Sequence, residues 1–285
     1  MPAASTVSRL LKQAEETLLA GGNELARRDA EIMLAHVLDC GISHLPLYDR
    51  ALSQDQIERF ESYVADRKTG KPVAYIIGEQ EFWSLTFKVN EHTLVPRPDT
   101  ETLVEVGLQN MPANKAVRFL DLGTGSGCIL LSLLHERPLA TGLGIDKSLG
   151  ALDVARDNAA QLGLAERGQF TQGDWFEGME AKGQFDLIVS NPPYIETADM
   201  KSLMPDVRDY EPLSALDGGA DGLNCYRRIV AEAPAFLRSG GTVAVEVGKG
   251  QDRAVMDLFS AAGLVDVQVR ADLAGINRVV FAKKA

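Results

Sequence analysis

An asparagine, two prolines and a tyrosine stand together at residues 191–194, directly after an apolar segment. The prolines hold φ at about −65° and lack an amide hydrogen, so the turn is rigid and its carbonyl oxygens are free. A planar NH₂ group has two outward hydrogens, which the Asn191 side-chain oxygen and the Pro192 carbonyl oxygen can accept. Pro193 stiffens the corner, and Tyr194 can stack on the planar group. We therefore predict that these four residues form a catalytic and substrate-binding corner that aims a weakly nucleophilic nitrogen at a methyl group.

A glycine-rich turn, Gly123-Thr124-Gly125-Ser126-Gly127, follows another apolar segment and precedes a helical pattern. Glycines let the backbone approach a ligand closely, and the N-terminus of the next helix then faces that ligand. The spacing lacks the extra residue of the dinucleotide fingerprint. Taken alone, the turn predicts either a nucleotide-like ligand or a plain tight turn.

Carboxylates stand near the ends of the predicted strands. Asp146, about twenty residues past the glycines, can accept from both hydroxyls of a ribose or cap the next helix. Asp174 can accept from an adenine amine, and Trp175 can cover the ring or pack in the core. Asp121 is a carboxylate near the turn, suited to a positively charged sulfonium. Together these residues favour S-adenosylmethionine over a nicotinamide, whose pyrophosphate would need cationic or amide donors.

From residue 116 onward, strand and helix patterns alternate, which predicts an α/β fold with a mainly parallel sheet and helices on both faces. The last two strands have no helix between them and are expected to form an antiparallel edge hairpin. Asp99 and Thr100 are expected to cap the first of the helices. The predicted strands are 117–122, 141–146, 169–172, 185–190, 242–247, 265–271 and 278–283, and the predicted helices are 101–109, 126–136, 149–162, 223–237 and 252–262.

The N-terminal part of the chain is predicted to be a small helical bundle without recognisable catalytic residues. Apolar residues recur at helical spacing, and Ser53 with Gln56 matches a capping box. Alternating apolar residues follow and predict a short hairpin. We predict three parts: a helical partner-recognition domain at 1–78, a hairpin linker at 79–98 and a methyltransferase domain at 99–285.

The bulk composition narrows the functional classes. The chain has 285 residues, of which 45% are hydrophobic and 24% charged, with a net charge of −11. No apolar run reaches the roughly 18 residues of a membrane span, and no signal-peptide pattern is seen, so we expect a cytoplasmic protein without a membrane partner. The acidic balance disfavours duplex DNA as a direct partner. Scattered cysteines and histidines predict no metal site, and we expect a monomer.

These motifs together are similar to those of the protein glutamine methyltransferases of the PrmC/HemK family. The resemblance covers nearly the whole chain and includes the segments 29–31, 78–82, 95–101, 207–212 and 221–223. That family methylates the glutamine of the Gly-Gly-Gln motif in class I peptide chain release factors. The resemblance therefore implies such a factor as the protein partner and S-adenosylmethionine, without a metal, as the cofactor.

The resemblance also implies an architecture and residue roles. It implies a five-helix N-terminal domain, a hairpin linker and a Rossmann-like class I methyltransferase sheet of seven strands. Residues 123–127, Asp146 and Trp175 would hold the cofactor, and residues 191–194 would hold both the glutamine amide and the methyl-donor side. The loop 216–220 lies outside these motifs, so we expect variation in it to leave them intact.

Three other functions remain open from the sequence. A sister family that methylates a ribosomal protein on glutamine shares the same corner. An adenine-amine methyltransferase would use the same geometry, but it must extract its base from the stack and would need a basic cleft. A non-catalytic module that keeps the fold is disfavoured by the intact Asn191 and glycines.

Overall fold

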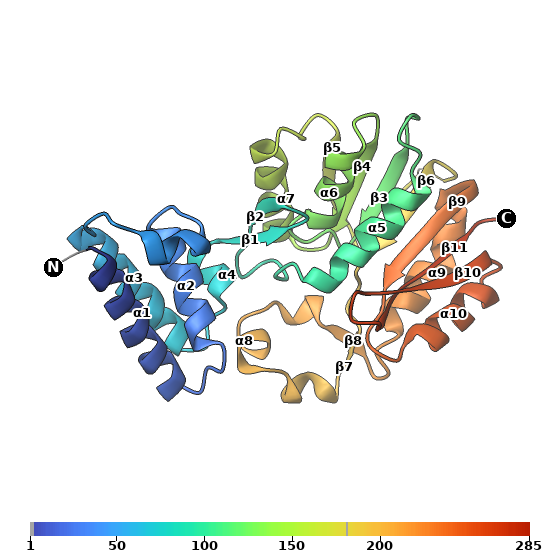
Figure 1. Cartoon of the computed structure of the whole chain (residues 1–285). Helices are drawn as coiled ribbons and strands as arrows, with labels where there is room; N and C mark the ends of the chain where they lie inside the picture. Colours follow the sequence, from blue (N-terminus) through green and yellow to red (C-terminus); the bar gives the residue numbers. More distant parts are fainter. Residues whose placement is uncertain (1–2, 181) are drawn as a thin grey trace. The chain divides into compact units, whose positions relative to one another are not determined.

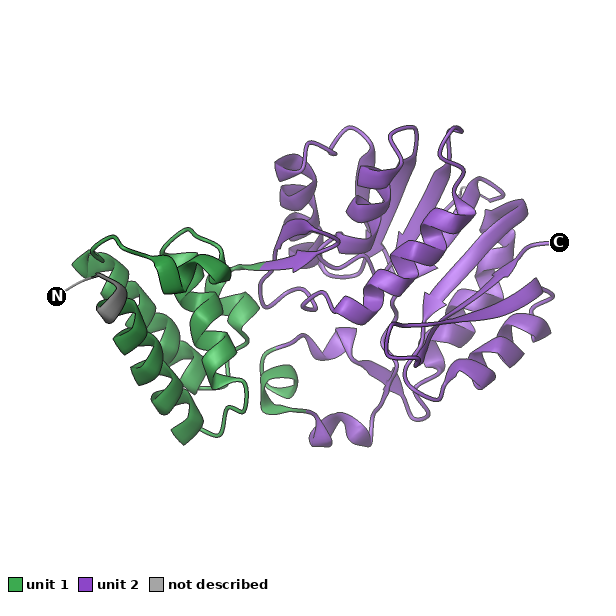
Figure 2. Cartoon of the chain, viewed as in Figure 1, with its two compact units in different colours: residues 1–79, 204–210 green, residues 80–203, 211–285 purple. Residues whose placement is uncertain are grey.

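The computed structural model describes residues 3–180 and 182–285, which form two compact units (Figure 2). Unit 1 contains the described residues up to Glu79 together with the later segment Met204–Tyr210. Unit 2 contains Gln80–Leu203 and Glu211–Ala285. Within the described residues, no helix combines the length and apolar character needed to cross a membrane.

Unit 1 is a helical bundle closed by a buried apolar core that includes Leu18, Met33, Leu34 and Phe60. The expected capping box is confirmed, because the Gln56 amide donates to Ser53 Oγ and the Ser53 amide donates to Gln56 Oε1. The elements are α1 (Ala3–Ala20), α2 (Ala26–Val37), the 3-10 helix η1 (Ile42–Leu47), α3 (Gln54–Lys68), α4 (Val73–Ile77) and, from the later segment, α8 (Pro205–Arg208).

Unit 2 is built on a seven-stranded sheet with the order β10-β11-β9-β6-β3-β4-β5. β11 runs antiparallel to both of its neighbours, and the other pairs are parallel. This confirms the predicted fold class: a Rossmann-like α/β sheet with an antiparallel edge hairpin, joined to a helical bundle. The strands are β3 (Arg118–Leu122), β4 (Thr141–Asp146), β5 (Gly168–Gln172), β6 (Phe185–Ser190), β9 (Leu237–Glu246), β10 (Val265–Ala271) and β11 (Asn277–Lys283).

Two apolar layers bury the faces of this sheet. Successive residues of β6 alternate between them, because Leu187 and Val189 belong to one cluster and Ile188 to the other. This alternation is the period of an extended strand. α5 (Glu101–Asn110), α6 (Cys128–Glu136) and α7 (Leu149–Gln161) contribute to the first layer, and α9 (Asn224–Phe236) and α10 (Asp252–Ala261) to the second (Figure 1).

The predicted cap of α5 is wrong. Pro98–Thr100 form a 3-10 turn, η2, that leads into the helix, and the Thr100 side chain makes no capping bond. Asp99 instead pairs with Arg278 of β11 at 2.7 Å. Thr100 Oγ1 accepts a hydrogen bond from Asn191 at 3.2 Å. Both side chains therefore serve long-range contacts rather than the helix end.

Two small sheets complete unit 2. β1 (Glu79–Phe82) and β2 (Leu85–Lys88) form the hairpin, and the turn residues Trp83 and Ser84 have φ of 54° and 57°. Beyond residue 194 the chain forms β7 (Ile195–Glu196), η3 (Asp199–Ser202), α8, η4 (Leu213–Ala215) and β8 (Asp217–Gly219). β7 and β8 pair in parallel, an arrangement that the sequence did not predict.

Candidate active site

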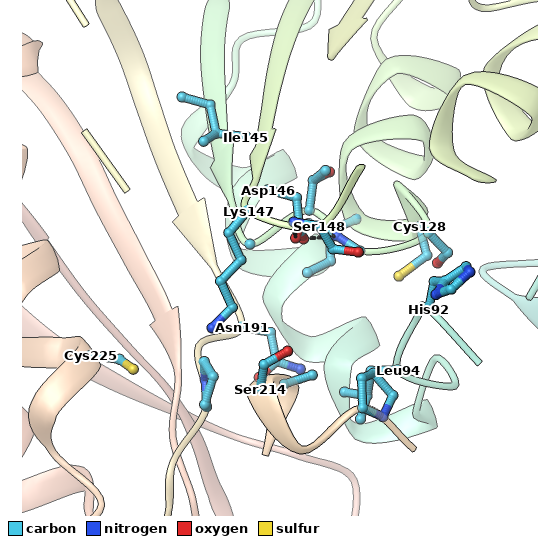
Figure 3. Close-up of a pocket in the computed structure, with 18 of the residues that line it drawn as sticks. His92, Leu94, Cys128, Ile145, Asp146, Lys147, Ser148, Asn191, Ser214 and Cys225 are labelled. Carbon is cyan, nitrogen blue, oxygen red and sulfur yellow. Dashed lines mark hydrogen bonds between the residues drawn. The ribbon is translucent and has the colours of Figure 1, made fainter. Parts of the chain in front are cut away.

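A pocket lies in unit 2 where β3, β4, β5 and β6 end, the edge at which ligands bind in sheets of this kind. These strands are neighbours in the sheet, so loops far apart in the sequence meet there. Figure 3 shows lining side chains, among them Asp146, Ser148 and Asn191, around a common space. Other walls come from His92, Leu94, Pro96, Arg97, Thr100, Pro212, Ser214, Ala215, Asp217, Cys225 and Arg228.

The structure brings most of the predicted site residues into this wall, but not all of them. Four lie outside the lining: Asp121, Gly127, Pro192 and Tyr194. The predicted residues that line the pocket are Gly123, Thr124, Gly125, Ser126, Asp146, Asp174, Trp175, Asn191 and Pro193.

The glycine turn leaves room for a ligand. Gly123, Gly125 and Gly127 have φ of 70°, 56° and 79°. Residues other than glycine rarely adopt this backbone conformation. A Cβ at Gly125 would meet no atom within 4 Å, whereas one at Gly127 would lie 3.2 Å from Leu131. Gly125 is therefore open to the pocket, and Gly127 allows α6 to pack closely.

Asp146 ties two loops of the pocket together. Its Oδ2 accepts from the Gly125 amide and its Oδ1 from the Ser148 amide, both at 2.9 Å. The cap of α7 is Ser148, whose hydroxyl accepts from the Ala151 amide, so the helix-cap interpretation of Asp146 is wrong. Each carboxylate oxygen still has acceptor capacity for a further donor.

Asp174 and Trp175 follow β5. Asp174 Oδ2 pairs with Arg228 Nη1 at 2.9 Å, so a cation already holds this carboxylate at the pocket wall. Trp175 has φ of 58° and packs against the second apolar layer while it also lines the pocket. The two interpretations of this tryptophan, as a ring cover and as a core residue, are therefore compatible.

Asp121 is buried behind the residues that line the pocket and does not line it itself. Its side chain is fully buried, and its Oδ2 accepts from Thr124 Oγ1 at 2.7 Å. Burial, with a contribution from the charge of Asp146, raises the pKa of Asp121 to about 7. The structure thus gives Asp121 the role of holding Thr124, and its link to the pocket runs through that residue.

The asparagine–proline corner is held from several directions. Ser190 Oγ donates to Leu122 O at 2.7 Å, which joins the ends of β6 and β3. Asn191 Nδ2 donates to Thr100 Oγ1, and Gln251 Nε2 donates to Tyr194 O at 2.9 Å. The Tyr194 hydroxyl is directed to Glu246 Oε1 at 3.5 Å, and burial raises the pKa of this tyrosine above its usual value. The contact with Thr100 uses one hydrogen of the Asn191 NH₂, and none of the residues that the structure describes donates a hydrogen bond to the Asn191 side-chain oxygen.

The loop at 216–220 supports the corner directly. A Cβ at Gly218 would lie 2.7 Å from Tyr194 Cα and 2.9 Å from Pro193 O, closer than real Cβ contacts. The expectation that variation in this loop leaves the corner intact is therefore wrong. The physical reason is the β7–β8 pairing, which places this loop against the corner.

Several residues of the site could not be identified from the sequence. Thr100 was interpreted as a helix cap, and Glu246 at the end of β9 was not singled out. Glu246 is only 2% exposed, and burial raises its pKa to about 7. An acidic residue at the end of an apolar strand was the one available signal, because such burial needs partners. The pair formed by Arg97 and the buried Glu211 was also missed.

Known families match both parts of the chain. Residues 9–78 match the family described as the PrmC N-terminal domain, and residues 100–205 match the methyltransferase small domain. Among solved structures, the hMettl16 catalytic domain in complex with MAT2A 3'UTR hairpin 6 is 14% identical, with a TM-score of 0.58 over 82% of this chain and 83% of that chain. A methyltransferase from Pyrococcus furiosus is also 14% identical, with a TM-score of 0.51 over 79% and 98%. At these identities the likeness concerns the fold alone.

Curated relatives are much closer in sequence. The release factor glutamine methyltransferase of Rhodospirillum rubrum is 45% identical over 99% of this chain and 86% of its own length. That of Bradyrhizobium diazoefficiens is 46% identical over 92% and 89%, and that of Caulobacter vibrioides is 43% identical over 98% and 96%. With this identity over nearly the whole length, and with the corner, the glycine turn and Asp146 gathered at one strand edge, the chain belongs to the family of release factor glutamine methyltransferases.

Proposed function

We propose that this protein transfers a methyl group from S-adenosylmethionine to the side-chain amide nitrogen of the glutamine in the Gly-Gly-Gln motif of class I peptide chain release factors. One observation carries the proposal. The NH₂ of Asn191 is bound to Thr100, so its oxygen is the acceptor left for a substrate NH₂ at the pocket wall. The names of the relatives support the choice of release factors over other carriers of such a group.

The pocket fits S-adenosylmethionine. Gly125 leaves backbone space for a ligand, and the carboxylates of Asp146 and Asp174 stand beside it for hydroxyl and amine donors. Trp175 offers a ring face in the same wall. When bound, the cofactor supplies a methyl group on a positively charged sulfur, which acidic surroundings favour.

The corner supplies orientation rather than strong base catalysis. The Asn191 side-chain oxygen and the Pro192 carbonyl oxygen would accept the two hydrogens of the glutamine amide and hold its nitrogen in line. The overall reaction replaces one N–H bond by an N–CH₃ bond and releases a proton. No strong base is needed early, because methylation itself makes that proton acidic. Orientation of reactants in this way can contribute about 7–11 kcal/mol in favourable cases.

Replacing Asp146 with alanine should weaken S-adenosylmethionine binding by about 10- to 100-fold, because hydrogen bonds to a charged group contribute about 1.5–3 kcal/mol each. The change also removes the bond that holds the Gly125 amide. Titration calorimetry measures the effect. Asp153→Ala is the control, since Asp153 is an exposed carboxylate paired with Arg156 on α7, and its loss should leave the affinity unchanged. Equal affinity of the Asp146 and Asp153 variants would remove Asp146 from the cofactor site.

The substrate can be tested with labelled S-adenosylmethionine. A release factor, its Gln→Ala version in the Gly-Gly-Gln motif, ribosomes and DNA are offered separately. We expect label in the intact release factor alone. Label in a ribosomal protein would instead support the sister activity, and label in DNA would contradict a protein substrate. We expect the reaction to take place in the cytoplasm, where release factors act, and the enzyme to work as a monomer.

We further propose that the helical unit recognises the protein partner. Removal of residues 1–75 should leave S-adenosylmethionine affinity within about threefold and lower release factor methylation by about 100-fold or more, since ordering a partner in a near-attack geometry can contribute that much. Calorimetry and the methylation assay measure the two effects. The truncation also removes Thr69, to which the Tyr210 hydroxyl bonds. Tyr210→Phe is therefore the control, and a truncated chain that methylates normally would refute the recognition role.

A further inference from the structure

A buried asparagine of α7 holds two backbone segments that are far apart in the sequence. Asn158 is fully buried, and its Oδ1 accepts from the Lys88 amide at 2.7 Å. Its Nδ2 donates to Lys88 O at 3.1 Å and to Ser126 O at 2.9 Å. An asparagine is a weak helix former and is costly to bury without partners. Its place inside α7 is therefore explained by these three hydrogen bonds rather than by helix formation.

The chemistry of the partners fixes the orientation of the Asn158 amide. The Lys88 amide nitrogen can only donate, so the side-chain oxygen of Asn158 faces it. The two carbonyl oxygens can only accept, so each receives one hydrogen of the NH₂ group. All three bonds are made to backbone atoms. Asn158 therefore holds the main chain at residues 88 and 126 independently of the side chains there.

Both of these backbone positions adjoin the wall of the pocket. Lys88 is the last residue of β2, and the segment 92–97 that follows it lines the pocket, for example with His92 and Leu94 (Figure 3). Ser126 belongs to the glycine turn and lines the pocket itself. Asn158 is not a lining residue. Its connection to the pocket therefore runs through the main chain of the segment 92–97 and of the glycine turn.

α7 also packs closely against the same two parts of the wall. A Cβ at Gly150, in the first turn of α7, would lie 2.6 Å from His92 Cγ. A Cβ at Gly127 would lie 3.3 Å from the Cβ of Ala155, which stands one turn before Asn158. The helix thus contacts both parts of the wall, and the Asn158 hydrogen bonds add a fixed distance between them.

We propose that Asn158 is a positioning residue that holds the segment 92–97 and the glycine turn at the separation that the cofactor needs. The proposal rests on the proposed function, in which S-adenosylmethionine occupies this pocket. Without Asn158 the two parts of the wall would adopt several separations, and only a fraction of the molecules would be competent to bind. The effect concerns cofactor binding rather than methyl transfer, because Asn191 is held by Thr100 instead.

The first test measures cofactor affinity in the full chain. Asn158→Ala removes all three hydrogen bonds, whereas Asn158→Asp keeps the shape and the acceptor for Lys88 but loses both donors. Each variant should raise Kd for S-adenosylmethionine by about 10- to 100-fold, because the apparent Kd rises as the competent fraction falls. At saturating cofactor, kcat and KM for the release factor should stay within about threefold of wild type.

Asn110→Ala is the matched control for these variants. Asn110 stands at the end of α5, bonds to Val106 O and to the Thr242 hydroxyl, and does not line the pocket. Its loss removes two side-chain amide bonds and should leave Kd unchanged. Urea unfolding identifies a temperature at which every variant is folded. Wild-type Kd in both folded Asn158 variants would overturn the proposal, and so would a loss of kcat without a change in Kd.

Hydrogen exchange tests the same role without a ligand. The Thr93 amide bonds to Asn90 O at 3.0 Å, and the Gly127 amide bonds to Thr124 O at 2.8 Å. Both bonds lie within their own turns and do not involve Asn158. Both amides should nevertheless exchange at least about tenfold faster in the two Asn158 variants, because local opening of each turn becomes easier. Their rates should not change in Asn110→Ala.

The Val247 amide distinguishes this local effect from a general loss of stability. It bonds to Arg278 O at 2.7 Å beyond the end of β9, so its exchange reports opening of the sheet. The Thr93 and Gly127 amides should accelerate more than Val247 does. If the wild type does not bind S-adenosylmethionine, the proposed function fails, but these rates still decide whether Asn158 holds both segments. Acceleration of only one of the two amides, or of neither, would overturn the positioning role.

Discussion

Asn191→Ala should lower kcat for methylation by at least about 100-fold, comparable to the loss of one preorganised hydrogen-bonding group in other active sites. The substitution removes the acceptor that the fold leaves facing the pocket, since the NH₂ of this side chain is bound to Thr100. The second acceptor, the Pro192 carbonyl, belongs to the backbone and stays. One acceptor cannot hold both hydrogens of a planar amide, so the nitrogen would lose its alignment. Single-turnover methylation of a release factor measures the effect directly.

The predicted loss concerns chemistry rather than binding. Affinity for S-adenosylmethionine should change by no more than about threefold, because the carboxylates and the glycine turn are untouched. Asn277→Ala is a matched control. Asn277, the first residue of β11, donates a hydrogen bond to Asp252 of α10 and does not line the pocket. If Asn191→Ala kept a tenth or more of the wild-type kcat, the corner would not be the element that orients the substrate.

The sheet could be predicted closely from the sequence. The strands 141–146, 185–190 and 265–271 coincide with β4, β6 and β10 to the residue. β6 is an apolar run that is buried on both faces, which leaves little freedom in where the strand ends. β10 is a largely exposed edge strand, and it could be predicted because its valines alternate with polar residues. Because the carboxyl ends of parallel strands meet at one edge, the prediction that the loops after them form one site followed from topology alone.

The residues that hold the pocket-lining side chains in place were less predictable, because their contacts join parts of the chain that are far apart in the sequence. Thr100 stands directly before a helix, where a threonine is usually a cap, and only the folded chain brings it to Asn191. Asp121 was expected beside the sulfonium. Strand alternation, however, places it on the side of β3 opposite Leu120 and Leu122, which both belong to the second apolar layer. Period-two alternation could have shown this from the sequence.

The segment between Tyr194 and α9 shows the same limit. Its elements are short, from two to four residues, so no periodicity could reveal them. Met204–Tyr210 belongs to unit 1, although it lies far along the chain from Glu79. Pro212 and Asp217 of the same segment line the pocket in unit 2. A stretch without catalytic motifs thus contributes residues to both units. Local sequence patterns cannot predict such a division, because it depends on contacts between residues far apart in the chain.

Gly218→Ala should lower kcat by about 100-fold, because displacing reacting groups by even 1 Å can have this effect. The added methyl would meet Tyr194 Cα at 2.7 Å and Pro193 O at 2.9 Å. Both are backbone atoms, so no side chain can rotate away, and either the corner or β8 must move. Gly218 is not among the glycines with positive φ, whereas its neighbour Gly219 has φ of 92°. Alanine at 218 therefore tests close approach without adding backbone strain.

Two measurements separate a displaced corner from a general loss of stability. Overpacking of this kind costs about 1–3 kcal/mol, so urea unfolding should show a modest decrease in the free energy of unfolding. Affinity for S-adenosylmethionine should remain close to wild type, since the glycine turn and Asp146 lie on other strands. Gly41→Ala is the control, because a Cβ there would meet its nearest atom at an ordinary 3.5 Å. If Gly218→Ala retained full kcat, the corner would not depend on close support from Gly218, and the prediction that this loop holds the corner in place would be wrong.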